Sequence, residues 1–190
     1  MNKFLIKKQS VFILFIFIAF FISCNKNKGL LNASFKGDRE KVISLLNETE
    51  VDVNARDNNQ NTPLILASSE GHTEIVSILL DRGANINAVE KGGNTSLLFA
   101  VGQKHDEVVK TLLSKNADVN IPNNEGATAL LNAISLENIE IVKLLIKNGA
   151  DLNYSTSDHL SAVYLAGYIQ NNELVEIIEE AKKKNNGNDR

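Results

Sequence analysis

Apolar and polar positions alternate along this chain in a way that predicts short paired helices. In residues 61–93, Thr62-Pro63 marks the start of a first helix, because Thr accepts a backbone N–H as N-cap and Pro fits the first helical position. Gly71-His72 breaks that helix. The stripe from Ile75 to Leu80 has helical period and stops at Gly83, a residue type that tolerates the left-handed conformation ending a helix. We expect a unit of helix, turn, helix and polar hairpin loop.

The same pattern returns along the chain with a step of 33 residues. The helix starts are Thr62-Pro63-Leu64, Thr95-Ser96-Leu97, Thr128-Ala129-Leu130 and Ser161-Ala162-Val163. A second series keeps this step: Asn54, Asn87, Asn120 and Asn153, preceded two residues earlier by Asp52, Asn85, Asp118 and Asp151. Self-similarity at this period predicts a solenoid, in which each unit buries its apolar face against its neighbours.

A first, less regular unit is found with a shift of 34 residues, which pairs Leu30 with Leu64 and Val42 with Val76. The extra residue lies in the loop 47–51. The predicted units are residues 28–60, 61–93, 94–126, 127–159 and 160–184. Units one and five carry polar residues where inner units are apolar, as expected of caps that meet water. We expect residues 185–190 to be a disordered tail.

The first 24 residues are typical of an export signal. Three lysines precede twelve unbroken apolar residues, Val11 to Ile22. That length suits the roughly 7 to 15 apolar residues of a signal peptide and falls short of the about 20 that span a bilayer. Phe21-Ile22-Ser23-Cys24 resembles a bacterial lipobox, with Phe in place of the common Leu. The resemblance implies that a diacylglyceryl group is attached to the Cys24 thiol and that the chain is cut before it.

Two other interpretations of Cys24 remain open: an ordinary signal peptide that leaves a free thiol, or an uncleaved anchor. Each exports the rest of the chain, because the lysines before the apolar run favour an N-terminus held inside. We predict a membrane-anchored lipoprotein of the cell envelope, on the periplasmic side or the cell surface. Residues 1–23 are then the signal peptide, and 24–27 the lipidated Cys with a short linker.

The exported part is acidic. Without residues 1–23 it holds 17 Lys and Arg against 23 Asp and Glu, a formal charge of −6. This argues against nucleic acid as a partner, because phosphate binding needs a basic surface. Cys24 is the only cysteine, so no disulfide stabilises the domain, and its stability must come from stacking of the repeats.

Candidate catalytic and metal-binding residues are few. His72 and His105 share one position of the repeat, but two His without a third ligand make a weak zinc site, and we interpret them as turn residues. The recurring Asp residues lack the glycine-rich loop of a calcium site. No serine lies in a Gly-x-Ser-x-Gly turn, and no Cys-His pair is available once Cys24 is anchored. We therefore predict no enzyme, no metal or other cofactor and no small-molecule substrate.

Over roughly residues 28–181 the repeating residues resemble the ankyrin repeat. The residues that match its pattern are Thr62-Pro63-Leu64, Ala67, Gly71-His72, Val76, Leu79-Leu80 and Gly83-Ala84. The resemblance implies an all-α repeat solenoid of about five units, two of them caps. The family's His after Thr-Pro-Leu, which links adjacent units by hydrogen bonds, is replaced by Ile65, Leu98, Leu131 and Tyr164, so we expect those links to be lost. Gln60 and His159 replace a loop Gly, so we expect distorted first and last hairpins.

In ankyrin-like proteins, partners contact the hairpin tips and the solvent side of the first helices, which together form a concave face. Carried onto this chain, the resemblance implies these partner-binding residues: Asn58, Asn59, Ser69, Glu70, Lys91, Asn94, Gln103, Asn124, Glu125, Ser135, Leu136, Asp158, Leu160, Tyr168 and Ile169. The N-terminal half of this set is small and polar, and the C-terminal half is apolar.

All three tyrosines, Tyr154, Tyr164 and Tyr168, lie in or next to the last unit, and tyrosine is favoured at interface hot spots. We hypothesise that a partner docks near units four and five. The competing interpretation is that the rings cover the open end of the solenoid.

Together these features predict a non-catalytic, exported, lipid-anchored monomer that binds another protein. One alternative is an immunity or inhibitor protein against a toxin or secreted enzyme, a role that some ankyrin-like proteins play. An alternative of another class is a hydrolase with an unrecognised site. That site would need clustered titratable residues, whereas Glu70, Lys91, Glu125 and Asp158 are spread over four units.

Overall fold

The structure, a computed structural model, describes residues 25–187, and within this range the chain is helical apart from turns, loops and two isolated β-bridges. The helices are a first one over residues 25–36, then α2 (Arg39–Leu46), α3 (Pro63–Ser69), α4 (Thr73–Asp81), α5 (Ser96–Gly102), α6 (Asp106–Ser114), α7 (Ala129–Ser135), α8 (Ile139–Lys147), α9 (Ala162–Tyr168) and α10 (Asn172–Gly187).

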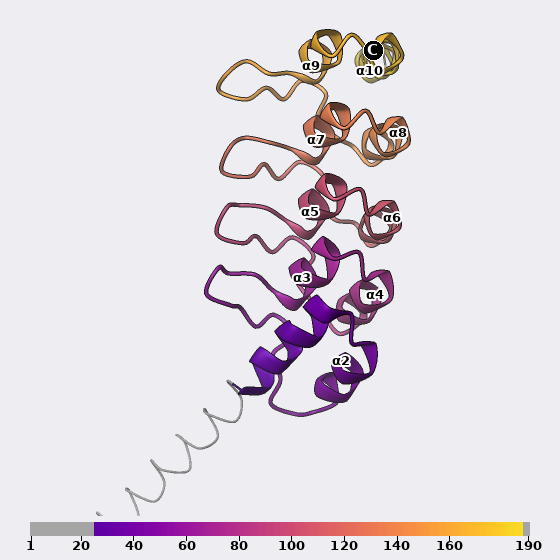
Figure 1. Cartoon of the computed structure of the whole chain (residues 1–190). Coiled ribbons are helices and arrows are strands. Elements are labelled where there is room, and N and C mark those ends of the chain that lie inside the picture. Colours follow the sequence, from indigo (N-terminus) through magenta and orange to yellow (C-terminus); the bar gives the residue numbers. More distant parts are fainter. Residues whose placement is uncertain (1–24, 188–190) are drawn as a thin grey trace, which may run out of the picture.

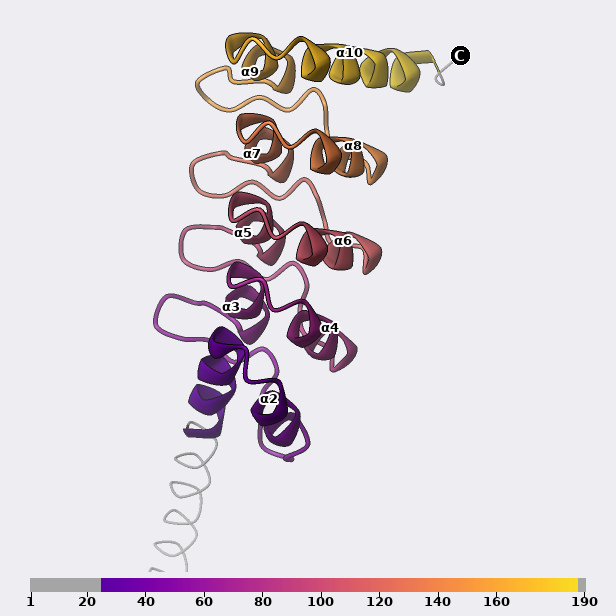
Figure 2. The same ribbon diagram turned by 45° about the vertical axis from the view of Figure 1, so that its right-hand side comes forward.

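These helices stack in two rows, with hairpin loops projecting along one side of the stack (Figures 1 and 2). The row next to the hairpins contains helix 25–36, α3, α5, α7 and α9, which we call the first helices. The other row contains α2, α4, α6, α8 and α10, the second helices. From α3 to α10, each helix packs against its partner in the same unit and the equivalent helix of the next unit. The predicted all-α repeat solenoid is confirmed.

Each first helix from α3 onwards starts at the predicted cap. Oγ1 of Thr62 accepts the N–H of Ile65 at 3.2 Å, and Pro63 occupies the first turn. Thr95, Thr128 and Ser161 cap α5, α7 and α9 in the same way. Small residues face the neighbouring helices, and the equivalent residues Ala67, Ala100, Ala133 and Ala166 are fully buried. The caps therefore set the phase of each helix, and the alanines let the row close up.

Left-handed residues end the helices where the sequence predicts. Gly71 has a φ of 78°, and the N–H of His72 donates to the carbonyl O of Ala67, a bond that closes the C-terminus of α3. Gly83 and Asn116 end α4 and α6 with φ values of 85° and 61°. In the last unit, Lys182 holds the position of Gly83 and Asn116. Helix α10 does not end there but continues to Gly187. The predicted unit boundary at 184 thus lies inside a helix, and residues 185–187 of the expected disordered tail are helical.

The four hairpins have the same backbone geometry, so the predicted distortion at Gln60 and His159 is wrong. Both residues take up the left-handed conformation of the usual Gly, with φ values of 66° and 63°. The N–H of Gln60 donates to the carbonyl O of Asp57, and that of His159 to the carbonyl O of Thr156. Gly93 and Gly126 donate equivalently in the other hairpins. The two non-glycine residues adopt the turn under strain rather than changing it.

The N-terminal segment of the described range differs from its prediction. Residues 25–27, expected to be a linker, are the first residues of helix 25–36. The predicted signal peptide, residues 1–23, and Cys24 lie outside the described residues. Among residues 25–187, no helix is long and apolar enough to cross a membrane.

Candidate protein-binding surface

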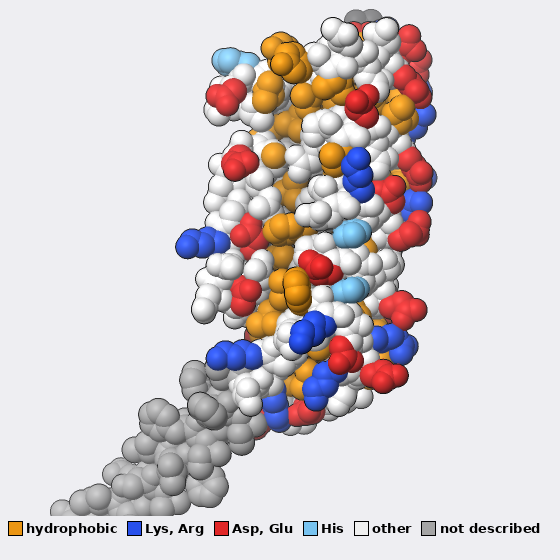
Figure 3. Space-filling model, in the orientation of Figure 1, with side chains coloured by type: hydrophobic (Ala, Val, Ile, Leu, Met, Phe, Trp, Pro, Cys, Tyr) orange, Lys and Arg blue, Asp and Glu red, His pale blue; other side chains and the backbone are white. Residues whose placement is uncertain are grey.

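The surface that carries the predicted binding residues consists of the hairpin loops and the exposed side of the first helices, which we call the hairpin face. In Figure 3 hydrophobic side chains form a column along the first helices, broadest over α9, between charged groups on the hairpins and on the second helices. Leu66, Phe99 and Leu165 share one position of the repeat and are half-buried. The strip is interrupted in α7, where Asn132 holds this position. An apolar strip with charged borders is a common layout of a protein-binding surface.

Each hairpin is closed by one side-chain acceptor at a fixed position of the repeat. Asp57, Glu90, Asn123 and Thr156 occupy this position, and each accepts the backbone N–H of the residue four positions later. Asp57, Glu90 and Asn123 also accept the N–H two positions later. Four different residue types thus build the same turn, because each places an oxygen at the same site.

Glu90 shows how strong this closure is. Burial by itself raises the pKa of a carboxyl group, but the N–H groups of Gly92 and Asn94 and the amide of Asn94 outweigh it. The result is a pKa of Glu90 below its ordinary value, which means that the hairpin stabilises the ionised form.

Neighbouring hairpins are also bound to each other. The N–H of Lys91 donates to the carbonyl O of Asn59 at 2.9 Å, and that of Asn124 to the carbonyl O of Gly92 at 2.9 Å. Nη1 of Arg56 bridges two hairpins by donating to the carbonyl O atoms of Gln60 and Val89. The tips of the first three hairpins are therefore joined to one another, and a partner would meet a preformed surface there.

Most predicted binding residues are exposed on this face. The exposed ones are Asn58, Asn59, Glu70, Lys91, Gln103, Asn124, Glu125, Ser135, Asp158, Leu160 and Tyr168. Four are half-buried: Ser69, Asn94, Leu136 and Ile169. The Asn94 amide is used inside the scaffold, because it donates to Glu90 and accepts from Asn123. Ser69 also has internal partners, since its hydroxyl donates to the carbonyl O of Leu66 and its own carbonyl O faces His105.

The C-terminal end of the face carries an aromatic pair. Tyr164 and Tyr168 stack with ring centroids 6.4 Å apart and are 57% and 75% exposed. Leu160, just before α9 in the sequence, is also exposed. The residues equivalent to Tyr164 in units two to four are buried under the next unit, so Tyr164 lies at the open end of the stack. Tyr154 has a structural role, because its hydroxyl donates to the carbonyl O of Gly126 at 3.0 Å.

One exposed aromatic residue was missed by the sequence reasoning. Phe35 in unit one is 47% exposed and occupies the position of Ser69 and Tyr168 in the repeat. The shift of 34 residues that aligns unit one also aligns Phe35 with this position, so the signal was present in the sequence. The face therefore has an aromatic residue at each end.

The turn histidines link adjacent units, so the links expected to be lost are supplied from another position. Nε2 of His72 lies 3.0 Å from the carbonyl O of Phe35, and Nε2 of His105 lies 3.0 Å from that of Ser69. Each ring covers a glycine of the preceding unit: a Cβ on Gly37 would lie 2.6 Å from His72, and one on Gly71 would lie 2.7 Å from His105. These contacts give each of the two histidines a structural role between units.

In the last two joints the turn of the preceding unit has a residue with a side chain in place of glycine, and the turn histidine is replaced by asparagine. Lys104 and Glu137 stand at the position of Gly71, and Asn138 and Asn171 stand at the position of His105. The Asn138 amide donates to Asp106 at 3.0 Å, and the Asn171 amide donates to Glu137 at 2.8 Å. A residue with a Cβ leaves no space for the imidazole, which explains why the residue pair changes together.

The recurring Asp and Asn residues form a second ladder between units. Oδ1 of Asn54 accepts the N–H of Asn85 at 2.7 Å, Asn87 accepts that of Asp118, and Asn120 accepts that of Asp151. Asp52 and its equivalents close a local turn by accepting the N–H two residues later. These Asp and Asn side chains therefore have backbone partners that explain their recurrence.

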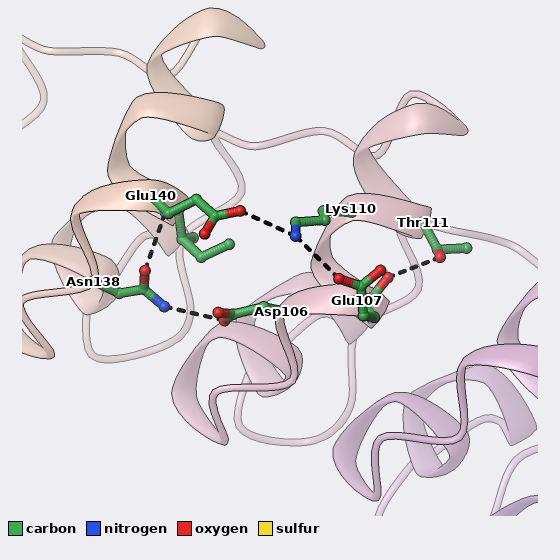
Figure 4. Close-up of polar contacts among 7 residues, drawn as sticks. Asp106, Glu107, Lys110, Thr111, Asn138 and Glu140 are labelled. Atoms are coloured by element: carbon green, nitrogen blue, oxygen red, sulfur yellow. Dashed lines mark hydrogen bonds and ion pairs between the residues drawn. The ribbon is translucent and has the colours of Figure 1, made fainter.

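Ion pairs on the second helices add a third set of links. Nζ of Lys110 lies 3.0 Å from both Glu140 and Glu107, and Asn138 bonds to Asp106 beside it, so α6 and α8 are joined (Figure 4). The hydrogen bonds with Glu140 and then Glu107 raise the pKa of Lys110 above its ordinary value. These pairs are exposed, so each contributes little by itself. Within residues 25–187, no three His, Cys, Asp or Glu gather as a metal site would require.

A family model of ankyrin repeats, with three copies, matches residues 30–123 and 115–189. The chain belongs to the ankyrin-repeat family. Ankyrin repeats commonly mediate binding between proteins and are typically non-catalytic. A comparison with curated proteins gives no significant match.

Proposed function

We propose that this protein is an exported, lipid-anchored monomer whose ankyrin repeats bind another protein through the hairpin face. The proposed anchor is Cys24, which follows a basic start, twelve apolar residues and a lipobox-like Phe21-Ile22-Ser23. The protein has no catalytic role in this proposal: its hairpin and turn polar groups are used to build the scaffold, and the face left exposed is suited to contact.

The observation that carries the proposal is the exposed aromatic end. Tyr164 and Tyr168 are large, stacked and solvent-exposed, and Leu160, just before α9 in the sequence, is also exposed. Large exposed apolar groups on a preformed scaffold favour binding, because little side-chain entropy remains to be lost on docking. We propose that the partner docks over units four and five and includes this pair.

The test is affinity purification of the lipoprotein from its own membranes. Tyr168→Ala with Leu136→Ala should abolish capture of the partner and leave the circular dichroism spectrum unchanged. Asn58→Ala with Gln103→Ala, exposed at the other end and middle of the face, is the matched control and should capture the partner normally. Undiminished capture by the first variant would refute docking at units four and five.

The anchor needs its own control. Cys24→Ser should abolish acylation, read by mass spectrometry of the membrane fraction, because the thiol that carries the lipid is absent. The identity of the captured protein then separates a resident envelope partner from a toxin or secreted enzyme. Capture of the latter, with loss of its activity in the complex, would favour the inhibitor alternative.

A further inference from the structure

The last unit leaves uncovered a surface that the following unit covers everywhere else in the stack. Helices α9 and α10 form the final layer, and within the described part of the chain no further helix packs on them (Figures 1 and 2). In units two to four, the same side of each unit packs against the helices of the next. We call this side of the last unit the end face, and it consists of Tyr164, Gly167, Val175, Glu176 and Glu179.

On α9, two positions that the inner units bury are open to solvent. Tyr164 is 57% exposed, whereas its equivalents in units two to four are at most 7% exposed. Gly167 is exposed as well, although Val101 and Ile134 at its position are buried. A Cβ added to Gly167 would have nothing within 4 Å. A neighbouring helix could therefore approach the backbone of α9 closely beside the Tyr164 ring.

On α10, the contacts of α8 show which side points along the stack. Lys143 and Ile146 of α8 face α10, because they line one groove together with Ile177 of α10. In the last unit, the positions of Lys143 and Ile146 are held by Glu176 and Glu179. These two acidic residues therefore lie on the side of α10 that a following unit would meet.

Glu176 stands where inner units form an ion pair with the unit that follows. Lys110 holds this position in unit three and pairs with Glu140 of the next unit at 3.0 Å. Glu176 and Glu179 are exposed and, among the residues that the structure describes, form no ion pair or hydrogen bond. The charge of the pairing position is thus reversed in the last unit, and the described chain supplies no basic partner for it.

The end face is also more apolar than a surface that only meets water needs to be. Val175 is half-buried, whereas Val142 at its position is fully buried under the next unit. The exposed Tyr164 ring is held in place by stacking on Tyr168. Exposed apolar groups of this size, bordered by charges, mark interaction surfaces. The end face therefore combines an apolar part with an adjacent acidic part.

We propose that the end face binds an amphipathic helix of the partner protein. That helix lays its apolar side on Tyr164 and Val175 and places Lys or Arg residues against Glu176 and Glu179. The inference rests on the partner-binding part of the proposed function, and not on the anchor, and it states the chemistry of the partner.

The repeats themselves indicate this occupant. A helix fits because the equivalent surface of units two to four is covered by helices. Basic residues fit because the two carboxylates lie one helical turn apart and have no partner within the described chain. Lys182 to Lys184 follow in α10, so the basic residues of the partner lie opposite its first half. A second copy matches less well, because a two-fold axis through the middle of α10 brings Glu179 and Glu180 of both copies together.

The first experiment uses the full chain in phosphatidylcholine nanodiscs, with empty nanodiscs as the reference, and two synthetic helices of about 18 residues, or five turns. Both helices have Leu on one side. One has Lys on the other side, and the second has Glu at the same positions. In fluorescence anisotropy the Lys helix should bind at least about tenfold more tightly, as expected of two exposed ion pairs. Equal affinities would refute the acidic site.

Charge reversal separates a local site from general attraction to an acidic protein. Glu176→Lys with Glu179→Lys should invert the preference, so that the Glu helix binds more tightly. Glu40→Lys with Glu74→Lys makes the same change of net charge on α2 and α4 and should keep the preference for the Lys helix. Inversion by both pairs would refute the end face.

A steric variant tests the apolar part. Gly167→Arg places a long side chain on the open surface and should weaken binding of the Lys helix more than about tenfold. Gly102→Arg in α5 is the matched control, because a Cβ there would also have nothing within 4 Å, and it should leave the affinity unchanged. Equal affinities of the two variants would contradict docking on α9.

Capture from native membranes distinguishes failure of this inference from failure of the proposed function. Glu176→Lys with Glu179→Lys should lose the partner. If that variant captures it normally while Tyr168→Ala with Leu136→Ala does not, docking on the hairpin face stands and the end face is refuted. If the unaltered chain captures no protein, the proposed function and this inference both fail.

Zero-length crosslinking of the captured complex with a carbodiimide, which joins carboxylates to lysines, identifies the occupant. We expect Glu176 or Glu179 to be linked to a lysine in a helical segment of the partner. With mixed ¹⁴N- and ¹⁵N-labelled chains, a link from these residues to Lys182 to Lys184 of a second copy would refute the basic helix and show a homodimer instead.

Discussion

The contact between units two and three allows a prediction of how much unfolding free energy one substitution costs. Gly71 has a φ of 78°, and its hypothetical Cβ would lie 2.7 Å from Nδ1 of His105, whose Nε2 faces the carbonyl O of Ser69 at 3.0 Å. In Gly71→Ala the left-handed backbone costs about 1 to 2 kcal/mol. Displacement of the ring also loses a hydrogen bond worth about 1 kcal/mol. We expect a total loss of about 2 to 3 kcal/mol in unfolding free energy.

The two costs can be separated with a double-mutant cycle. His105→Asn removes the ring and should cost about 1 kcal/mol, the value of its hydrogen bond. In the double variant the clash is gone, and the loss should again be about 2 to 3 kcal/mol, so the coupling energy is about 1 kcal/mol. The four proteins are compared by urea unfolding followed by circular dichroism.

A second cycle serves as the control. Gly37→Ala introduces the same backbone strain in another joint, where the covering ring is His72. Its effect should add to that of His105→Asn within about 0.5 kcal/mol, because a Cβ on Gly37 would meet the ring of His72 and not that of His105. Additive costs in the Gly71 and His105 cycle as well would refute the steric account of the paired turns.

Three further changes test the hairpins and caps. Ser96→Pro should raise the unfolding free energy by about 1 kcal/mol, measured by thermal unfolding. Ser96 lies at the helix position that Pro63 occupies in α3, and its buried hydroxyl has no hydrogen-bond partner. A lower melting temperature would contradict this. Gln60→Gly should also stabilise by about 1 kcal/mol by relieving the left-handed strain, and no gain would show that the turn is unstrained. Glu90 has a lowered pKa, so its contribution is present above the unfolded value near 4.5 and is lost as the pH falls through the folded value. Glu90→Gln should therefore lower the urea midpoint at neutral pH and reduce the further loss on acidification, and an unchanged pH profile would refute the role of this carboxylate.

The repeat and its helix boundaries could be predicted because each depends on one residue and its near neighbours. Thr62 and Pro63 start α3, and Gly71 and Gly83 end α3 and α4, for reasons that operate within one turn of helix. The extended α10 follows the same logic, since Lys182 replaces the helix-ending residue. Lys182 in place of a helix-ending residue predicts a helix that continues past this position, and the boundary predicted at 184 did not take this into account.

The links between units could not be predicted in the same way, because they join residues about 35 positions apart. The loss of the family's His suggested weaker joints, whereas His72 and His105 reach the preceding unit from the turn. The intact hairpin at Gln60 likewise depends on Arg56 and Asp57, which hold it from both sides. On the candidate surface, the aromatic C-terminal end could be predicted from residue type alone. That Asn94 and Tyr154 form hydrogen bonds inside the scaffold could be seen only from their contacts.

We propose that a protein partner docks on the hairpin face near units four and five, and site-specific photocrosslinking in native membranes tests this docking. A photoreactive residue is placed at Tyr168, at Asn58, or at Lys147 on the second-helix side, each exposed in the structure. We expect one crosslinked protein from position 168, and none from positions 58 and 147. Crosslinking of the same protein from position 147, with none from position 168, would contradict it.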